Sequence, residues 1–219
     1  MNWFNFMECF RPGGLELTQK ALDKTELKAG DKVLDIGCGL GASLEYIREK
    51  YKADVYGVDV QPLAVQRAAE RLGPDRVFCT DAAKLPFESG SFHLALMECV
   101  LTLIPEPEKA LQEALRVLTP GGCLAITSLT GKCEGSLCRQ GRMELDQLRK
   151  SLEKLGAEII FCSDETAMLR QFIAEMIFRF DSLENYITQA NQSLGGSILN
   201  CSVPIKGTGY ALIIIKKAQ

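Results

Sequence analysis

The sequence predicts an α/β fold in which a parallel sheet carries helices on both faces. Apolar segments of strand length alternate with amphipathic segments of helical length over residues 32–129, as in a parallel sheet with crossover helices. A turn with three glycines, Gly37-x-Gly39-x-Gly41, joins the first of these strands to a helix. The turn Thr119-Pro120-Gly121-Gly122 leads into the fifth strand.

The individual elements follow from the hydrophobic period and from the turn residues. Strands are expected at residues 32–36, 54–58, 76–79, 92–97, 123–129, 157–162 and 209–216. Helices are expected within residues 1–11 and at 16–27, 42–51, 62–72, 106–118, 144–155, 166–179 and 183–192. Pro62 fits the first turn of its helix, where its missing N–H costs nothing, and Pro12-Gly13-Gly14 separates the first two helices.

No linker or internal repeat divides the chain, so we expect one domain over residues 1–219. Its expected parts are an N-terminal helical lid (1–29), a core (30–163 and 208–217) and a helical insert on the substrate side (164–207). Trp3, Phe6, Met7 and Phe10 share one face of the first helix, which either packs on the sheet or covers the site.

Composition excludes several classes of protein. Of the 219 residues, 47% are hydrophobic and 24% charged, and the formal net charge of −3 offers no electrostatic attraction to nucleic acid. No apolar run approaches the ~18 residues of a membrane helix, and the N-terminus lacks the pattern of a signal peptide. We therefore expect a cytoplasmic protein with nine reduced cysteines, of which Cys79, Cys123 and Cys162 lie in apolar strand patterns and are expected in the core. The sequence predicts no oligomeric state.

The glycine turn has the features of a nucleotide-binding motif. Glycine allows positive φ and close approach of a ligand, and the following helix points free N–H groups at it. Gly37-x-Gly39-x-x-Ala42 also satisfies the fingerprint of NAD enzymes. Asp59, at the end of the second strand, suits the ribose of either S-adenosylmethionine or NAD, so the turn alone leaves both cofactors open.

Three features favour S-adenosylmethionine. Asp35 stands two residues before Gly37, where a carboxylate opposes a pyrophosphate but suits a ligand with an ammonium and a sulfonium group. Asp81 follows the third strand, where it can accept a hydrogen bond from the adenine amino group. The third feature is the segment 115–122, which leads into the fifth strand.

In order and spacing, these segments resemble the motifs of class I S-adenosylmethionine-dependent methyltransferases. The resemblance covers about residues 30–130 and rests on 33–41 (VLDIGCGLG), 55–59 (VYGVD), 81–87 (DAAKLPF) and 116–122 (RVLTPGG). It implies a Rossmann-like, doubly wound sheet of seven strands whose last strand is antiparallel, with 209–216 as the candidate for that strand. It also implies S-adenosylmethionine as the cofactor.

Roles for individual residues also follow from the resemblance. The implied cofactor contacts are Asp35, Gly37, Cys38, Gly39 and Gly41 at the methionine moiety, Asp59 at the ribose, Val60, Asp81 and Ala82 at the adenine, and Met97 and Glu98 at the end of the fourth strand.

The sequence assigns no catalytic residue. Methyl transfer from a sulfonium is an in-line displacement, so positioning can supply most of the rate and a base is needed only for some acceptors. His93, the single histidine, is expected away from the cofactor end of its strand. Glu98 and Cys99 are the candidates nearest the chemistry, and for Glu98 a role at the cofactor edge without proton transfer is preferred.

Three cysteines suggest a substrate site. Cys99, Cys133 and Cys138 are expected at the carboxyl end of the sheet, with Cys9 on the helix above it, where thiols could hold a soft, thiophilic centre. Residues 96–103 also resemble the fourth-strand motif of arsenite methyltransferases. The alternatives are that these cysteines are incidental or that they have a redox or iron–sulfur role. Because C-x-x-C spacing is absent, no structural zinc site is predicted.

We therefore expect methyl transfer to a small molecule, because the segment 166–192 is rich in Met and Phe and no basic face is present. Three alternatives stay open: a thiol or arsenite acceptor held by Cys99 with Cys133 or Cys138, a non-catalytic S-adenosylmethionine-binding protein, and an NAD-dependent oxidoreductase.

Overall fold

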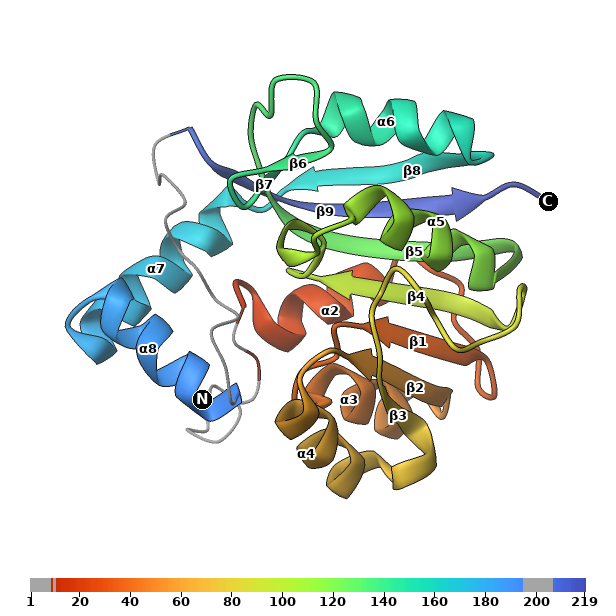
Figure 1. Ribbon diagram of the computed structural model, residues 1–219, viewed down its shortest axis with the longest axis horizontal. Helices are drawn as coiled ribbons and strands as arrows, with labels where there is room; N and C mark the ends of the chain where they lie inside the picture. The colour runs from red at the N-terminus through yellow and green to blue at the C-terminus, as the bar shows by residue number, and fades with distance from the viewer. Residues whose placement is uncertain (1–8, 10, 195–206) are drawn as a thin grey trace.

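The computed structural model describes residue 9, residues 11–194 and residues 207–219, which form a sheet with helices on both faces (Figure 1). The strands are β1 (Lys32–Ile36), β2 (Asp54–Asp59), β3 (Val77–Cys79), β4 (Phe92–Glu98), β5 (Leu118–Thr130), β6 (Cys138–Arg139), β7 (Arg142–Met143), β8 (Ala157–Asp164) and β9 (Gly209–Lys217). The helices are α2 (Gly14–Leu22), α3 (Ala42–Tyr51), α4 (Pro62–Leu72), α5 (Pro107–Val117), α6 (Leu145–Lys154), α7 (Thr166–Phe180) and α8 (Leu183–Leu194), with short 3₁₀ turns η1 (Pro74–Arg76) and η2 (Leu101–Leu103). The helix expected within residues 1–11 lies outside the described residues except for Cys9 and Arg11.

The sheet is doubly wound. Strands β3, β2, β1, β4 and β5 lie side by side in that order and pair in parallel, so the direction of winding reverses between β1 and β4. Beyond β5, β9 pairs antiparallel to both β5 and β8. The expectation of seven main strands with an antiparallel last strand is confirmed.

Two details of the sheet differ from the expected elements. Strand β5 begins at Leu118 instead of residue 123, because Leu118 pairs with Phe92 across a register shift that lies between Phe92 and Leu94. The expected loop after β5 contains the two-residue strands β6 and β7, which pair antiparallel to each other. Both additions are short pairings that a hydrophobic pattern does not encode.

Each face of the sheet has its own core, because successive strand residues point to opposite faces. On one face, α5 and α6 bury residues such as Leu111 and Leu148 against β1, β4 and β5. On the other face, helices α2, α3 and α4 bury residues such as Leu17, Ile47 and Ala68. The helices pack on the two faces of the sheet, and in folds of this kind ligands bind at the carboxyl ends of the central strands.

Two cysteines expected in the core lie elsewhere. Cys79 and Cys162 are exposed, and Cys123 is only partly buried. The physical reason for the two exposed thiols is that β3 and β8 are outer strands of the main sheet and are covered less completely than its centre.

Helices α7 and α8 form a hairpin that projects from the sheet (Figure 1). Met176, Tyr186 and Ala190 form a small core of their own between the two helices. None of the helices in the described ranges combines the length and apolar character of a membrane span.

Candidate functional site

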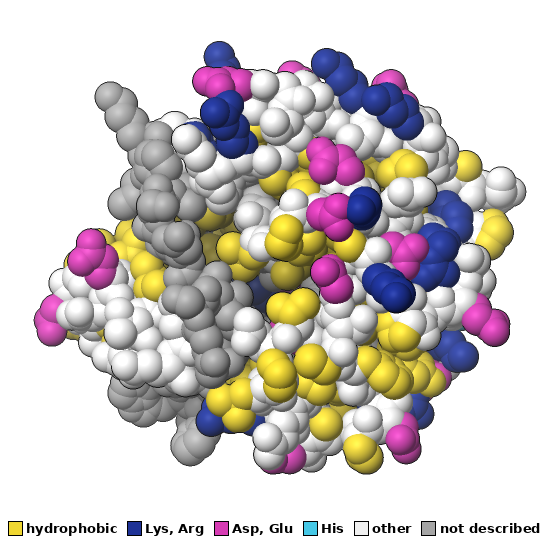
Figure 2. Space-filling view, in the orientation of Figure 1, with side chains coloured by type: hydrophobic (Ala, Val, Ile, Leu, Met, Phe, Trp, Pro, Cys, Tyr) yellow, Lys and Arg dark blue, Asp and Glu magenta, His cyan; other side chains and the backbone are white. Residues whose placement is uncertain are grey.

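A cavity of about 440 Å³ lies at the carboxyl ends of β1, β2 and β4, where the winding of the sheet reverses. Figure 2 shows a hollow on this face, with hydrophobic side chains around it. Nine of the predicted cofactor contacts line the cavity: Asp35, Gly37, Cys38, Gly39, Asp59, Val60, Asp81, Ala82 and Glu98. The volume is in the range of pockets that hold small ligands.

The glycine turn forms one wall of this cavity. Gly37 has a φ of 81°, and an added Cβ would lie 2.4 Å from Val100 Cγ2. Gly39 has a φ of 52°, and an added Cβ would meet nothing within 4 Å, so its backbone faces open space. The Gly39 N–H donates to Asp59 Oδ2 at 2.9 Å, which ties the turn to the end of β2.

Two predicted contacts lie outside the cavity lining. Gly41 begins α3 with a φ of 79° and packs against α4, where an added Cβ would lie 3.2 Å from Ala68 Cβ. Met97 is fully buried in the core beneath the strand end. Both residues pack behind the residues that line the cavity.

Asp35 is the least satisfied polar residue of the cavity. It is 3% exposed, and its Oδ1 atom has no hydrogen-bond partner. Burial raises the pKa of Asp35 well above its ordinary value, and the nearby Glu98 carboxylate raises it further. A cationic group from a ligand would supply the missing partner.

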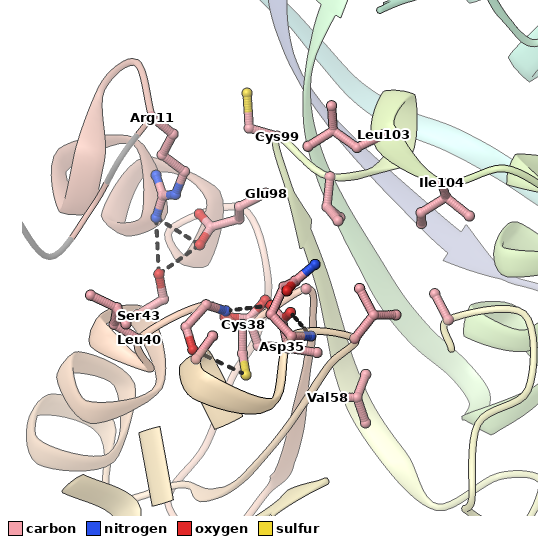
Figure 3. Close-up of a pocket in the computed structure, with 18 of the residues that line it drawn as sticks. Arg11, Asp35, Cys38, Leu40, Ser43, Val58, Glu98, Cys99, Leu103 and Ile104 are labelled. Carbon is pink, nitrogen blue, oxygen red and sulfur yellow. Dashed lines mark hydrogen bonds and ion pairs between the residues drawn. The ribbon is translucent and has the colours of Figure 1, made fainter. Parts of the chain in front are cut away.

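Glu98, by contrast, is surrounded by donors (Figure 3). Arg11 donates to Glu98 Oε2 at 2.7 Å, Thr18 donates to Oε1 at 2.9 Å, and Ser43 donates to Oε2 at 2.8 Å. Burial lowers the pKa of Arg11, but the surrounding acidic groups, Glu98 foremost and Asp35 among them, together raise that pKa above its ordinary value. Sequence reasoning missed Arg11, Thr18 and Ser43, and the only signal was the turn at residues 11–14.

A second group of residues that sequence reasoning missed forms an apolar wall. Val100, Leu103, Ile104 and Pro105 lie at and after η2 and line the cavity. Leu103 is 39% exposed, and Val60 on the opposite side is 56% exposed, so both leave apolar surface for a ligand.

Of the three cysteines predicted as a substrate site, only Cys99 lines the cavity. It adopts a φ of 60°, unusual for a residue other than glycine, where β4 ends. Cys133 is buried in the loop after β5, with its Sγ 3.2 Å from the Arg142 carbonyl oxygen. Burial and the neighbouring Cys133 raise the pKa of Cys138 to about 12, so Cys133 and Cys138 are protonated thiols away from the cavity. Cys9, instead, lines the cavity with Cys99.

His93 and the aromatic residues Phe172, Tyr186 and Tyr210 do not line the cavity. His93 is half exposed near the start of β4, and its Nδ1 atom accepts from the Lys32 N–H at 3.0 Å. Phe172 and Tyr186 pack against each other in the hairpin of α7 and α8. Tyr210 is buried in β9, with its hydroxyl 3.5 Å from the Pro12 carbonyl oxygen.

Known proteins are similar to this chain in sequence. Residues 34–126 match the family model described as a methyltransferase domain. The chain is 27% identical over 207 residues to methyltransferase GfsG of Streptomyces halstedii, covering 83% of this chain and 74% of that protein. It is 38% identical over 120 residues to phosphoethanolamine N-methyltransferase of Plasmodium falciparum, covering 52% of this chain and 45% of that protein.

Solved structures show the same fold. The [4+2]-cyclase SpnF is 27% identical with a TM-score of 0.72, covering 93% of this chain and 81% of that one. Phosphoethanolamine N-methyltransferase 2 of Haemonchus contortus, solved in complex with S-adenosyl-L-methionine, is 22% identical with a TM-score of 0.74. The match covers 97% of this chain and 54% of that chain.

Proposed function

The chain belongs to the class I S-adenosylmethionine-dependent methyltransferases, and we propose from this premise that it methylates a small molecule bound in the cavity. The cofactor supplies a methyl group on a sulfonium sulfur, which is a good leaving group. The protein therefore has to bind the cofactor and the acceptor, orient them and exclude water. Positioning then provides most of the acceleration.

The unpaired Asp35 Oδ1 atom is the observation that carries this proposal. A buried charged group without a partner is costly, and an ammonium group on a ligand would remove that cost. The pyrophosphate of NAD would instead place negative charge beside Asp35 and Glu98, which disfavours the oxidoreductase alternative.

Other cavity residues fit the remaining parts of the cofactor. Both Asp59 oxygens accept backbone N–H groups, from Gly39 and Gln61, which fixes the carboxylate, and each oxygen has further acceptor capacity for a ribose hydroxyl. Asp81 is held in a similar way by the Ala83 N–H at 2.8 Å. The exposed Val60 side chain offers an apolar surface to adenine.

The apolar wall at η2 supports a small acceptor. Leu103 and Ile104 border the cavity on the side of Cys99, and its volume suits a small ligand better than a polymer. The related enzymes named for phosphoethanolamine and tocopherol also act, by their names, on small molecules. We further propose a cytoplasmic location, which fits the reduced state of the eight described cysteines.

Isothermal titration tests the cofactor. S-adenosylhomocysteine should bind the wild-type chain and NAD should not. Asp59→Ala should lose most of the affinity, at least tenfold, because two charge-assisted contacts to the ribose disappear. Binding of NAD without S-adenosylhomocysteine, or normal binding by Asp59→Ala, would show that the cofactor or the ribose assignment is wrong.

One observation favours a second candidate acceptor. Cys99 lines the cavity with Cys9 at its acceptor side, so a thiophilic acceptor such as arsenite could bind there. The test compares arsenite-dependent formation of S-adenosylhomocysteine by wild type and Cys99→Ser. Equal rates in the two proteins would remove Cys99 from the mechanism.

The similarity to the [4+2]-cyclase SpnF favours a third candidate, cofactor binding without methyl transfer, because that protein of the same fold is named for another reaction. Incubation with methyl-labelled cofactor and a panel of small acceptors distinguishes a methyltransferase from a binding protein. Label transferred to any acceptor supports a methyltransferase, and tight binding without transfer supports the binding protein.

A further inference from the structure

Two carboxylates lie buried at the same end of the cavity. Asp35 and Glu98 are 3% and 9% exposed, and the Glu98 charge raises the pKa of Asp35. Arg11 is the buried cation beside them, and it acts in the opposite direction on Asp35. Arg11 therefore lets two acidic groups remain together in a site that little water reaches.

The contacts of the two carboxylates show different roles. Both Glu98 oxygens accept from protein donors, whereas one Asp35 oxygen has no partner. Glu98 is thus a charge held in a fixed place, and Asp35 is the group left for a ligand. Figure 3 shows Arg11 and Ser43 directed at the Glu98 carboxylate, away from the wall at Leu103.

The position of Arg11 is set by elements outside the cavity. Its Nη1 atom donates to the Gly14 carbonyl oxygen at 2.6 Å, which closes the turn before α2. Gly13 in that turn has a φ of 76°, and an added Cβ would lie 2.7 Å from Leu17 Cβ and 3.0 Å from Met168 Sδ. The turn that carries Arg11 therefore packs against both α2 and α7, and this packing fixes the position of the guanidinium.

We infer that Arg11 is a positioning residue: by holding the Glu98 carboxylate in place, it makes the cavity select ligands that carry the amino-acid part of S-adenosylmethionine over ligands that carry only the nucleoside. The inference rests on the proposed function of the cavity. Without Arg11, Glu98 is a buried charge with no cation beside it, so it must move or take up a proton. The end of the cavity that holds Asp35 and Glu98 then loses the arrangement that an ammonium group requires.

Titration calorimetry with two ligands tests this role. S-adenosylhomocysteine carries the amino-acid part, and 5′-methylthioadenosine has the nucleoside and the thioether without it. Arg11→Met should bind S-adenosylhomocysteine at least tenfold more weakly and methylthioadenosine within twofold of wild type. Arg11→Lys keeps the charge but not the fork of donors, so it should recover part of the lost affinity.

Lys20→Met is the matched control, because Lys20 pairs with Glu165 from the same helix region but lies outside the cavity lining. In Lys20→Met, the ratio of the affinity for S-adenosylhomocysteine to that for methylthioadenosine should equal the wild-type ratio. A ratio in Arg11→Met within twofold of wild type, or equal losses for both ligands, would overturn the inference. If Arg11→Met does not fold, Arg11→Lys carries the test, and an unchanged ratio in that variant overturns it. Failure of wild type to bind S-adenosylhomocysteine would instead overturn the proposed function.

Discussion

Among single residues, Asp35 combines the greatest cost to the fold with the clearest use. Its buried Oδ1 atom has no partner, and burial followed by the Glu98 charge raises the pKa of the carboxyl. A group with a raised pKa in the folded state stabilises the protein below its unfolded pKa and loses that contribution as the pH rises through the folded value. Asp35 is thus a residue where stability and ligand binding make opposite demands.

Asp35→Asn should therefore stabilise the ligand-free protein while weakening S-adenosylhomocysteine binding at least tenfold. The gain in unfolding free energy over wild type should be small near pH 4 and grow as the pH rises, reaching about 1 kcal/mol or more. Urea unfolding from pH 4 to pH 8 measures it. Asp54→Asn, in the ion pair with Arg76, is the control and should show no such growth. A gain for Asp35→Asn that is independent of pH would contradict the account.

Gly57 in β2 sets how closely the glycine turn approaches the sheet. A Cβ at this position would lie 2.7 Å from Cys38 Sγ and 2.8 Å from Leu44 Cδ1. Gly57→Ala should cost about 1–3 kcal/mol of unfolding free energy and weaken cofactor binding, because the turn must shift. Adding Cys38→Ala should restore part of both losses. Thermal unfolding and calorimetry measure them, and a fully tolerated Gly57→Ala would refute the close approach.

Residue types in the sequence pointed to only part of this site. Asp35 was predicted because a carboxylate just before the glycine turn suits a ligand with an ammonium and a sulfonium group, and Asp59 because a carboxylate at the end of the second strand suits a ribose. Arg11, Thr18 and Ser43 were not predicted, because they meet Glu98 only after α2 and α3 pack on the sheet. The expected convergence of Cys99 with Cys133 and Cys138 was not found, since the loop after β5 turns its thiols inward.

Among the elements, the hairpin of α7 and α8 has a small core of its own beyond Leu169, the α7 residue that is buried in a core of the sheet. Its small core contains Met176, Tyr186 and Ala190, whereas Phe178 is 88% exposed. Elements with few buried contacts open at lower free energies than the central strands. We therefore expect the part of the hairpin around Met176 to open at a lower free energy than the cavity wall at β1 and β4.

Met176→Ala should lower hydrogen-exchange protection in α7 and α8 without changing protection in β4 and β5. The lost contacts are confined to the hairpin, so the loss of local stability should be about 2–5 kcal/mol or as much as the hairpin possesses. Exchange read by mass spectrometry compares the two regions. Ile126→Ala in the sheet core is the control and should lower protection in all of them. A uniform loss in Met176→Ala would show that the hairpin unfolds with the sheet.

For the whole molecule, ligand binding and folding should be linked. A ligand present at 100 times its dissociation constant stabilises the folded state by about 2.7 kcal/mol. For a chain of this length, S-adenosylhomocysteine should then raise Tm by roughly 5–10 °C. NAD should leave Tm unchanged, and Asp59→Ala should lose most of the shift at the same ligand concentration. Thermal melts with each ligand check this, and a shift with NAD alone would contradict it.

The global arrangement was more predictable than the fine detail. Alternating segments, the glycine turn and the resemblance over residues 30–130 were sufficient for the doubly wound sheet and its antiparallel last strand, but they did not predict the order of the strands. The short strands β6 and β7 and the early start of β5 at Leu118 were not predicted, because single backbone pairings leave no hydrophobic period. The expected division into lid, core and substrate-side insert stays a prediction.

The position of β9 has a consequence for synthesis of the chain. This strand follows all the other described strands along the chain, yet it lies between β5 and β8 and pairs with both. During translation β8 has no strand to join, and one edge of β5 offers unpaired backbone groups to any neighbouring chain. Emerging polypeptides are thus exposed to mispairing until Gly209–Lys217 leaves the ribosome, and chaperone demand should depend on those nine residues more than on any earlier strand.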